Sequence, residues 1–139
     1  MSSESQPIEM SLQRIRILIV EDDEYNKAII ATYLKSFNFE IFFALNGLEA
    51  VTLVRKIPDI HLILMDIHMP VLNGLDAIKQ IKRIHPEIPI IIVTASFFHT
   101  DIEVIQNSGC DDYLIKPYSK ADLISKIEKF LLIAEAYLH

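Results

Sequence analysis

The feature that most constrains the fold of this chain is an alternation of short aliphatic runs with longer amphipathic segments. The alternation repeats five times, which is typical of a series of strand-helix units. The expected strands are 15–20, 40–44, 61–66, 88–94 and 111–115. The first, third and fourth are nearly unbroken Ile, Leu, Val and Met, which is the composition of strands buried on both faces of a parallel sheet. Helices must therefore cover both faces.

Helix starts and inward stripes can also be predicted. Four segments open with a side-chain acceptor that is followed three residues later by an acid, the spacing of a capping box. These pairs are Asn46 with Glu49, Asn73 with Asp76, Thr100 with Glu103, and Ser119 with Asp122. Two apolar stripes at helical spacing are expected to face the core. They are Tyr25, Ile29, Ile30, Tyr33, Leu34 and Phe37 in one segment, and Leu123, Ile124, Ile127, Phe130, Leu131 and Leu138 in another.

Five such units in 139 residues are too few for an eight-fold barrel. We therefore predict the α/β class, with an open doubly wound five-stranded parallel sheet, flavodoxin-like in its strand order 2-1-3-4-5, and five helices. Residues 1–13 are polar and acidic and are expected to be a disordered N-terminal lead-in, and residues 14–139 are expected to form one domain. Because the last helix runs close to the final residue, any effector is expected to be a separate molecule or a part cut away.

Composition narrows the functional classes. No apolar run approaches the ~20 residues needed to cross a bilayer, and the N-terminus does not resemble a secretion signal. A single cysteine, Cys110, fits a reducing compartment. The net charge of −6, without a cluster of Lys or Arg, argues against direct binding of nucleic acid. We expect a cytoplasmic protein with no membrane or nucleic-acid partner.

Polar residues stand where four of the five predicted strands end. Glu21 and Asp22 follow the first strand, Asp66 ends the third, Thr94 ends the fourth, and Lys116 follows the fifth. Ligands of open parallel sheets bind at the carboxyl ends of the strands, and the predicted order makes the first and third strands neighbours. The three acids should therefore share one pocket.

Three carboxylates in one pocket repel one another, which raises the pKa of at least one of them unless a cation compensates. Oxygen-only ligands, too few to form a complete cage, suit Mg²⁺ better than calcium or zinc. The sequence therefore predicts a magnesium site. Considered alone, Asp66 could merely cap a turn, but a protein that uses it only for stability gains little from three acids in one crevice, because like charges at that range are costly without a partner.

Four motifs resemble the response-regulator receiver family of two-component signalling. They are Ile-Val-Glu-Asp-Asp at 19–23, Met-Asp-Ile-His-Met-Pro-Val-Leu-Asn-Gly at 65–74, Val-Thr-Ala at 93–95 and Tyr-Leu-Ile-Lys-Pro at 113–117. Each motif is weak alone, whereas all four in order, each at a strand end, are specific. The resemblance covers residues 14–132.

The resemblance implies the roles of the acids. Asp66 would be the phosphorylated carboxylate, and Asp22 and Asp66 would bind Mg²⁺ directly. Glu21 would hold the ion mainly through water, and the backbone carbonyl of His68 would complete the protein ligands.

The resemblance also implies the roles of three residues on the last two strands. Lys116 would pair with the phosphoryl group, Thr94 would donate its hydroxyl to it, and Tyr113 would turn inward when Thr94 moves. The bond between Lys116 and Pro117 is usually cis in the family. Positioning and neutralisation of charge account for most catalysis of phosphoryl transfer, which agrees with these roles.

The function expected from the resemblance is a phosphorylation switch rather than an enzyme of turnover. It would take a phosphoryl group from a histidine kinase or histidine phosphotransfer protein in a Mg²⁺-dependent, self-catalysed reaction, and lose it by slow autodephosphorylation. A downstream protein would read the change at the fourth helix, fifth strand and fifth helix. Phe97 and Phe98, in the loop before the fourth helix, either pack against that helix or contact a partner, and the resemblance favours the partner. Two alternatives stay open. One is a pseudo-receiver that only binds partners, and the other is an aspartyl phosphohydrolase, which would need an acid where His68 stands.

Overall fold

The computed structural model describes residues 14–67, 73–95 and 99–131, apart from the side chains of residues 99–101. The strands are β1 (Arg16–Val20), β2 (Glu40–Ala44), β3 (Ile60–Met65), β4 (Ile90–Thr94) and β5 (Asp112–Ile115). The helices are α2 (Glu24–Leu34), α3 (Gly47–Lys56), α4 (Gly74–Ile84), α5 (His99–Gln106) and α6 (Lys120–Phe130). Among the described residues, no helix is long and apolar enough to span a bilayer. All five predicted strands are confirmed: β2 has the predicted bounds, and the bounds of the other four differ by one or two residues.

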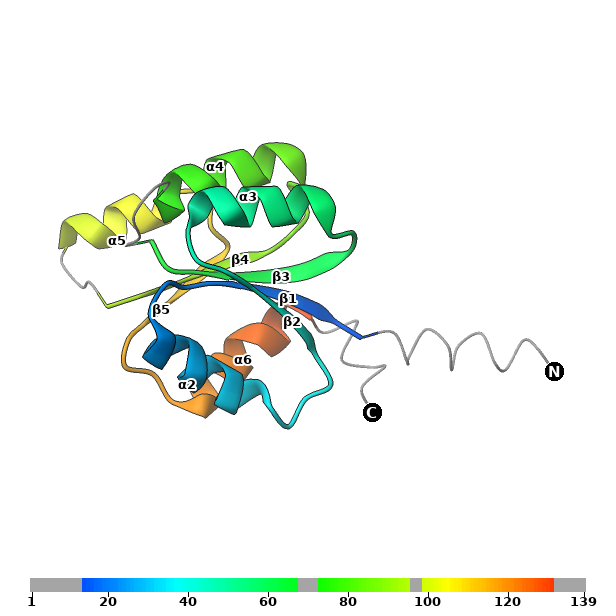
Figure 1. The fold of residues 1–139 in the computed structure, drawn as a ribbon. Coiled ribbons are helices and arrows are strands. Elements are labelled where there is room, and N and C mark those ends of the chain that lie inside the picture. The colour runs from blue at the N-terminus through cyan, green and yellow to red at the C-terminus, as the bar shows by residue number, and fades with distance from the viewer. Residues whose placement is uncertain (1–13, 68–72, 96–98, 132–139) are drawn as a thin grey trace.

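The strands form one parallel sheet in the order β2-β1-β3-β4-β5, which confirms the predicted fold class. Helices α3, α4 and α5 cover one face, and α2 and α6 cover the other (Figure 1). The register places Val20 of β1 beside Ala44 of β2 and Met65 of β3. The first three strands therefore end together, and we call this side of the sheet, where the strands have their carboxyl ends, the carboxyl edge.

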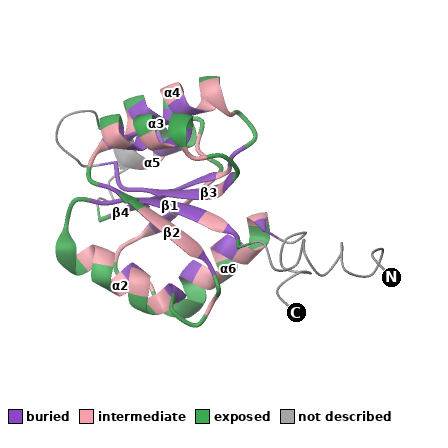
Figure 2. Ribbon diagram, turned by 45° about the vertical axis from the view of Figure 1, so that its right-hand side comes forward, coloured by how far each residue is buried: buried purple, intermediate pink, exposed green. Residues whose placement is uncertain are grey.

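Both faces of the central strands are buried, as Figure 2 shows for β1, β3 and β4. Along β1, Leu18 and Val20 belong to the cluster beneath α3, α4 and α5, whereas Ile17 and Ile19 belong to the cluster beneath α2 and α6. Alternation along a strand sends successive side chains to opposite faces. An aliphatic run is therefore needed, because each side chain meets one of the two cores.

The predicted capping residues Asn46, Asn73 and Ser119 each accept a hydrogen bond from the backbone N–H three residues on. At Ser119 the box is complete, since its own backbone N–H donates to the Asp122 carboxylate at 3.2 Å. Helix α2 is capped by Asp23, which accepts from the backbone N–H of Asn26 at 2.8 Å and was not among the predicted caps.

Two expectations about helices were wrong. Helix α5 begins at His99, so Thr100 lies inside the helix and not at its cap. Tyr25 does not face the core, because its side chain is 74% exposed. It lies in the first turn of α2, beyond the strand ends, where the sheet no longer provides a surface to cover it. Leu138, Phe97 and Phe98 lie outside the described residues.

The start of β5 is fixed by Asp111. Its Oδ2 accepts from the backbone N–H of Ile90 and from Lys82 Nζ, both at 2.8 Å. Lys82 also donates to the carbonyl of Ile88 at 2.8 Å, so one lysine of α4 joins the loop before β4 to the beginning of β5. These bonds anchor β5, the edge strand that carries Tyr113, to α4 and β4.

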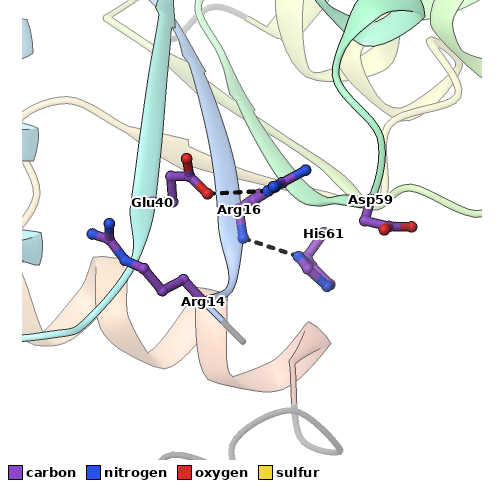
Figure 3. Close-up of a pocket in the computed structure, with 5 residues that line it drawn as sticks. All are labelled: Arg14, Arg16, Glu40, Asp59 and His61. Atoms are coloured by element: carbon purple, nitrogen blue, oxygen red, sulfur yellow. Dashed lines mark hydrogen bonds and ion pairs between the residues drawn. The ribbon is translucent and has the colours of Figure 1, made fainter. Parts of the chain in front are cut away.

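A polar hollow of about 530 Å³ lies at the opposite edge of the sheet, where the strands begin (Figure 3). It is lined by Arg14, Arg16, Glu40, Asp59 and His61. The Arg16 guanidinium donates to Glu40 at 3.1 Å, and the Arg16 backbone N–H donates to Nδ1 of His61 at 2.9 Å. Burial, assisted by the positive charge of Arg16, lowers the pKa of His61 despite the opposing carboxylate of Asp59.

Candidate functional site

Backbone hydrogen bonds extend the sheet by one residue beyond its strands and so place two of the predicted acids. The N–H of Glu21 donates to the carbonyl of Ala44, and the N–H of Asp66 donates to the carbonyl of Val20, each at 3.0 Å. Each acid is therefore held by the strand next to its own. Their positions follow from the parallel ladder and not from a flexible loop.

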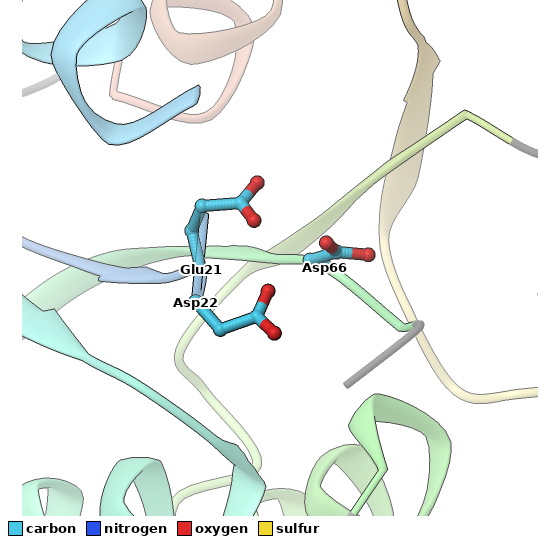
Figure 4. Close-up of side chains that lie close together, drawn as sticks. All are labelled: Glu21, Asp22 and Asp66. Carbon is cyan, nitrogen blue, oxygen red and sulfur yellow. The ribbon is translucent and has the colours of Figure 1, made fainter. Parts of the chain in front are cut away.

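Glu21, Asp22 and Asp66 lie together at this edge (Figure 4). Each offers a carboxylate oxygen within 4.8 Å of the others. Glu21 and Asp66 are buried, with 2% and 8% of their surface exposed, whereas Asp22 is exposed. The predicted convergence of the acids from β1 and β3 is present, and one of the three opens toward solvent.

Lys116 directly follows β5, the edge strand two places from β3, and its side chain reaches the acids. Its backbone N–H donates to the carbonyl of Thr94 at 2.8 Å, which aligns the ends of β4 and β5. Its Nζ lies 2.8 Å from Glu21 Oε1 and 3.7 Å from Asp66 Oδ2. The bond from Lys116 to Pro117 is cis. The lysine thus stands between two buried carboxylates, closer to Glu21.

Burial raises the pKa of Glu21, and the negative charge of Asp66 acts in the same direction. The hydrogen bonds from Lys116 Nζ and from the backbone N–H of Asp23 oppose this rise. Burial thus disfavours the ionised form of Glu21, and a further positive charge nearby would stabilise that form.

The charges of the cluster suit a divalent cation. Three carboxylates and one ammonium group leave two negative charges in excess at neutral pH when all four groups are ionised. The donors are all oxygen, and the exposed side of Asp22 leaves room for water ligands, which Mg²⁺ usually retains. The residues present therefore fit a hard divalent ion.

The first residue of α4 packs against the backbone that carries Asp66. A Cβ at Gly74 would lie 2.5 Å from the carbonyl oxygen of Asp66 and 2.6 Å from Cα of Ile67. The Gly74 N–H donates to the carbonyl of Ile67 at 3.4 Å. Glycine at this position allows the helix to begin directly behind the acid.

The remaining predicted residues are placed as follows. Thr94 is fully buried at the end of β4, and Tyr113 is half-buried on β5, where it packs against the core beneath α3, α4 and α5. Register pairs Tyr113 with Ile92, so it lies on the strand next to Thr94 and nearer its start. His68 lies outside the described residues, so the binding of Mg²⁺ by its backbone carbonyl stays a prediction.

Sequence reasoning missed a hollow beside the acids. Its volume is about 410 Å³, and its lining residues are Tyr25, Asn26, Ile29, Tyr33, Ala95, Lys116, Pro117 and Tyr118. We call it the tyrosine hollow. The rings of Tyr33 and Tyr118 meet edge to face, with centroids 6.0 Å apart. Tyr25 and Tyr33 lie eight residues apart on α2, and the sequence predicted that both face the core.

Comparison with known proteins agrees with this geometry. Residues 17–128 match the family model of the response regulator receiver domain. The chain is 37% identical over 132 residues to the transcriptional regulatory protein ZraR of Klebsiella oxytoca, across 94% of this chain. It spans 28% of the length of ZraR, and 53% of the length of a second relative, the response regulator SaeR of Staphylococcus aureus.

Two of the solved structures that share the fold are receiver domains of signalling proteins. One is the receiver domain of a sensor histidine kinase from Pseudomonas aeruginosa, crystallised with magnesium in its active-site cleft; it is 30% identical, covers 86% of this chain and 98% of its own, and superposes with a TM-score of 0.79. The other is the receiver domain of the Saccharomyces cerevisiae response regulator Ssk1, bound to the histidine phosphotransfer protein Ypd1; it is 35% identical, covers 84% and 88%, and has a TM-score of 0.76. Sequence match, strand order and the meeting of the acids thus agree, and the chain belongs to the response regulator receiver domain family.

Proposed function

We propose that this chain accepts a phosphoryl group from a phosphohistidine donor on Asp66, in a Mg²⁺-dependent reaction in the cytoplasm, and thereby switches a partner-binding surface. The family acts as phosphorylation-controlled switches and not as enzymes of turnover. The observation that carries the proposal is the meeting of Asp66, Glu21 and Asp22 with Lys116 at one edge of the sheet.

In the proposed transfer, a carboxylate oxygen of Asp66 forms a bond to phosphorus while the bond from phosphorus to the donor imidazole nitrogen breaks. The imidazole keeps the electron pair of that bond and takes up a proton, and the product is an acyl phosphate. Asp66 needs only to be an ionised and aligned nucleophile. Lys116 Nζ, at 3.7 Å from Asp66 Oδ2, is close enough to pair with the phosphoryl oxygens after transfer.

Asp22 and Asp66 would hold Mg²⁺ directly, Glu21 would hold it mainly through water, and His68 would offer its backbone carbonyl. When bound, the ion supplies neutralisation of the charge on the phosphoryl oxygens. The chain's own residues orient the acceptor, because the backbone bonds of Glu21 and Asp66 fix both acids against neighbouring strands. Lys116 already neutralises part of the charge, and would move from Glu21 toward the phosphoryl group.

The switch would use Thr94 and Tyr113. Thr94 is buried at the end of β4, and a movement of its hydroxyl toward the phosphoryl group would free space beside it. Tyr113 is only half-buried on the adjacent strand, so rotation of its side chain toward the core would bury more of the ring. A downstream protein would read the change at α5, β5 and α6. Phosphorylation would shift the populations of the two conformers, and the size of the shift would be set by how much more strongly the phosphoryl group interacts with one conformer than with the other.

The phosphodonor would dock at the tyrosine hollow. Receiver domains pair with histidine phosphotransfer proteins or kinases, as in the complex of Ypd1 with Ssk1. The hollow adjoins Lys116, and Tyr25 at its rim is 74% exposed. Exposed aromatic side chains beside a reactive group are suited to contact a partner. A histidine kinase or histidine phosphotransfer protein seated there would bring its phosphohistidine to Asp66.

The test is a phosphorylation assay on the intact chain. The protein is incubated with Mg²⁺ and acetyl phosphate, and intact mass is followed. We expect a phosphoryl mass gain that is stable in acid and labile in base, and that is lost in Asp66→Asn and when EDTA replaces Mg²⁺. Asp59→Asn, an acid at the opposite edge of the sheet, is the matched control and should keep the gain.

Two outcomes would contradict the proposal. A mass gain that persists in Asp66→Asn would place the acceptor elsewhere. No gain from either acetyl phosphate or a phosphorylated histidine phosphotransfer protein would favour a pseudo-receiver that only binds partners. Continuous release of phosphate at many turnovers per molecule would indicate the aspartyl phosphohydrolase instead.

A further inference from the structure

Lys126 of α6 contacts two neighbouring residues of β5 that point to opposite faces of the sheet. Its Nζ donates to Asp112 Oδ1 at 2.9 Å and lies 6.0 Å from the centroid of the Tyr113 ring. Side chains alternate along a strand, so Asp112 points to the same face as Leu114, which belongs to the core beneath α2 and α6. Tyr113 points to the other face and packs against the core beneath α3, α4 and α5. Because β5 is the edge strand, a side chain from α6 can pass around it and meet the ring.

Asp112 holds this lysine in place. The carboxylate is only 11% exposed, and its Oδ1 also accepts from the backbone N–H of Tyr113 at 2.8 Å. One oxygen atom thus joins Lys126 to the backbone of the residue whose ring it contacts. A long flexible lysine would otherwise sample many positions, and a buried anion reduces that freedom.

We propose that Lys126 is a positioning residue for Tyr113: anchored by Asp112, its ammonium group stabilises the ring position seen here and opposes the inward rotation of the switch. The inference rests on the proposed function, because it assigns Tyr113 the role given there. A cation near an aromatic ring attracts it through the ring quadrupole. The attraction is lost when the ring turns away, so it favours one of the two positions.

Lys129 provides a matched control on the same helix. Its Nζ donates to the other oxygen of Asp112 at 3.1 Å, but the ring that it contacts is that of Phe130, with 5.4 Å to the centroid. Replacing either lysine by methionine keeps a long unbranched side chain and removes one positive charge beside Asp112. Only the replacement of Lys126 removes the contact with the Tyr113 ring.

The experiment compares the ring signals of Tyr113 by NMR in four proteins: wild type, Lys126→Met, Lys129→Met and Lys126→Arg. The Tyr113 signals are assigned with Tyr113→Phe. In the unphosphorylated chain we expect Lys126→Met to shift them, Lys129→Met to leave them in place, and Lys126→Arg to restore them, since a guanidinium keeps both contacts. Urea unfolding of each variant checks that the fold is retained.

A titration with beryllofluoride, the activating agent named for a related receiver domain, then measures the switch. We expect the midpoint in Lys126→Met to fall roughly two- to five-fold, the range for a partly exposed contact between a cation and a ring. Lys129→Met should keep the wild-type midpoint.

Equal ring shifts in both methionine variants, or none in Lys126→Met, would overturn the proposal. A shifted ring with an unchanged midpoint would overturn its regulatory part. If wild type does not respond to beryllofluoride, the proposed function is at fault, while the ring comparison in the unphosphorylated chain still decides the role of Lys126.

Discussion

Gly74 occupies a position where a single methyl group would meet two backbone atoms. A Cβ there would lie within 2.6 Å of both the Asp66 carbonyl oxygen and Cα of Ile67. Backbone cannot rotate away as a side chain can, so Gly74→Ala must displace either the start of α4 or the segment that carries Asp66. We expect a loss of about 1–3 kcal/mol in the free energy of unfolding, measured by urea titration, together with a displaced Asp66 amide signal in NMR.

Asn73→Ala is the control for that substitution. It removes the cap of α4, whose side chain accepts from the backbone N–H of Asp76 at 3.0 Å, and should cost about 1 kcal/mol. It introduces no new atom beside Asp66, so the Asp66 amide should stay where it is. A Gly74→Ala protein as stable as wild type would show that the close approach is not needed.

At this scale the sequence predicted which side chains converge, and why. Glu21, Asp66 and Lys116 follow strands of a parallel sheet, and such strands end at one edge, so their meeting needed only the strand order. Which acid Lys116 pairs with could not be predicted from the sequence. Lys116 lies closer to Glu21 than to Asp66, and the two distances, 2.8 and 3.7 Å, differ by less than an ångström. Residue types and spacing do not carry that information.

Helix α6 depends on its first turn, because the capping box of Ser119 and Asp122 satisfies backbone N–H groups that no preceding turn can pair. We expect Ser119→Ala to lower the free energy of unfolding by about 1 kcal/mol, measured by urea titration. Ser125→Ala, on the exposed side of the same helix, is the control, and should be neutral or slightly stabilising because alanine is the better helix former. Equal losses in both would show that the cap does not stabilise α6.

Elements were predictable where chemistry is local. Three of the four predicted caps were correct, since a side chain that accepts from the backbone three residues on acts within one turn. The start of α5 was not, because Thr100 had the right spacing but lies inside the helix. Tyr25 shows a related limit. Helical periodicity gives the direction of a side chain and not whether the sheet extends far enough to cover it.

At the scale of the whole molecule, folding should depend on pH through His61. Its ordinary pKa is 6.5 and burial lowers it in the fold, so the unfolded chain binds the proton more readily. The stability contribution is therefore complete above pH ~6.5 and is lost as the pH falls toward the folded value, by up to about 1.4 kcal/mol per pH unit. Urea unfolding between pH ~5.5 and ~7.5 should show this slope.

His61→Asn is the informative variant, because the asparagine oxygen can still accept from the Arg16 backbone N–H while nothing at this position titrates. The slope in this interval should become shallower. The same slope in wild type and variant would assign the pH dependence to other groups.

The overall topology was the most predictable level of all. Aliphatic runs long enough to face two cores, separated by capped amphipathic segments, are compatible with few arrangements, and right-handed crossovers reduce these further. What lay beyond prediction was the tyrosine hollow, because a hollow depends on how residues from α2, from the segment after β4 and from the loop after β5 approach one another.

The polypeptide enters β1 and leaves α6 on the same side of the molecule (Figure 1), and Ile15 and Leu131 pack into one cluster there. The acids lie at the other end of the strands. A fluorescent protein or surface tether joined near residue 14 or 131 would thus leave the reactive edge clear. Conversely, cargo joined at residue 14 or 131 would lie at the opposite end of the strands from Asp66, so a phosphoryl group on that residue, as proposed, would act on the cargo through motion transmitted along the sheet and its helices.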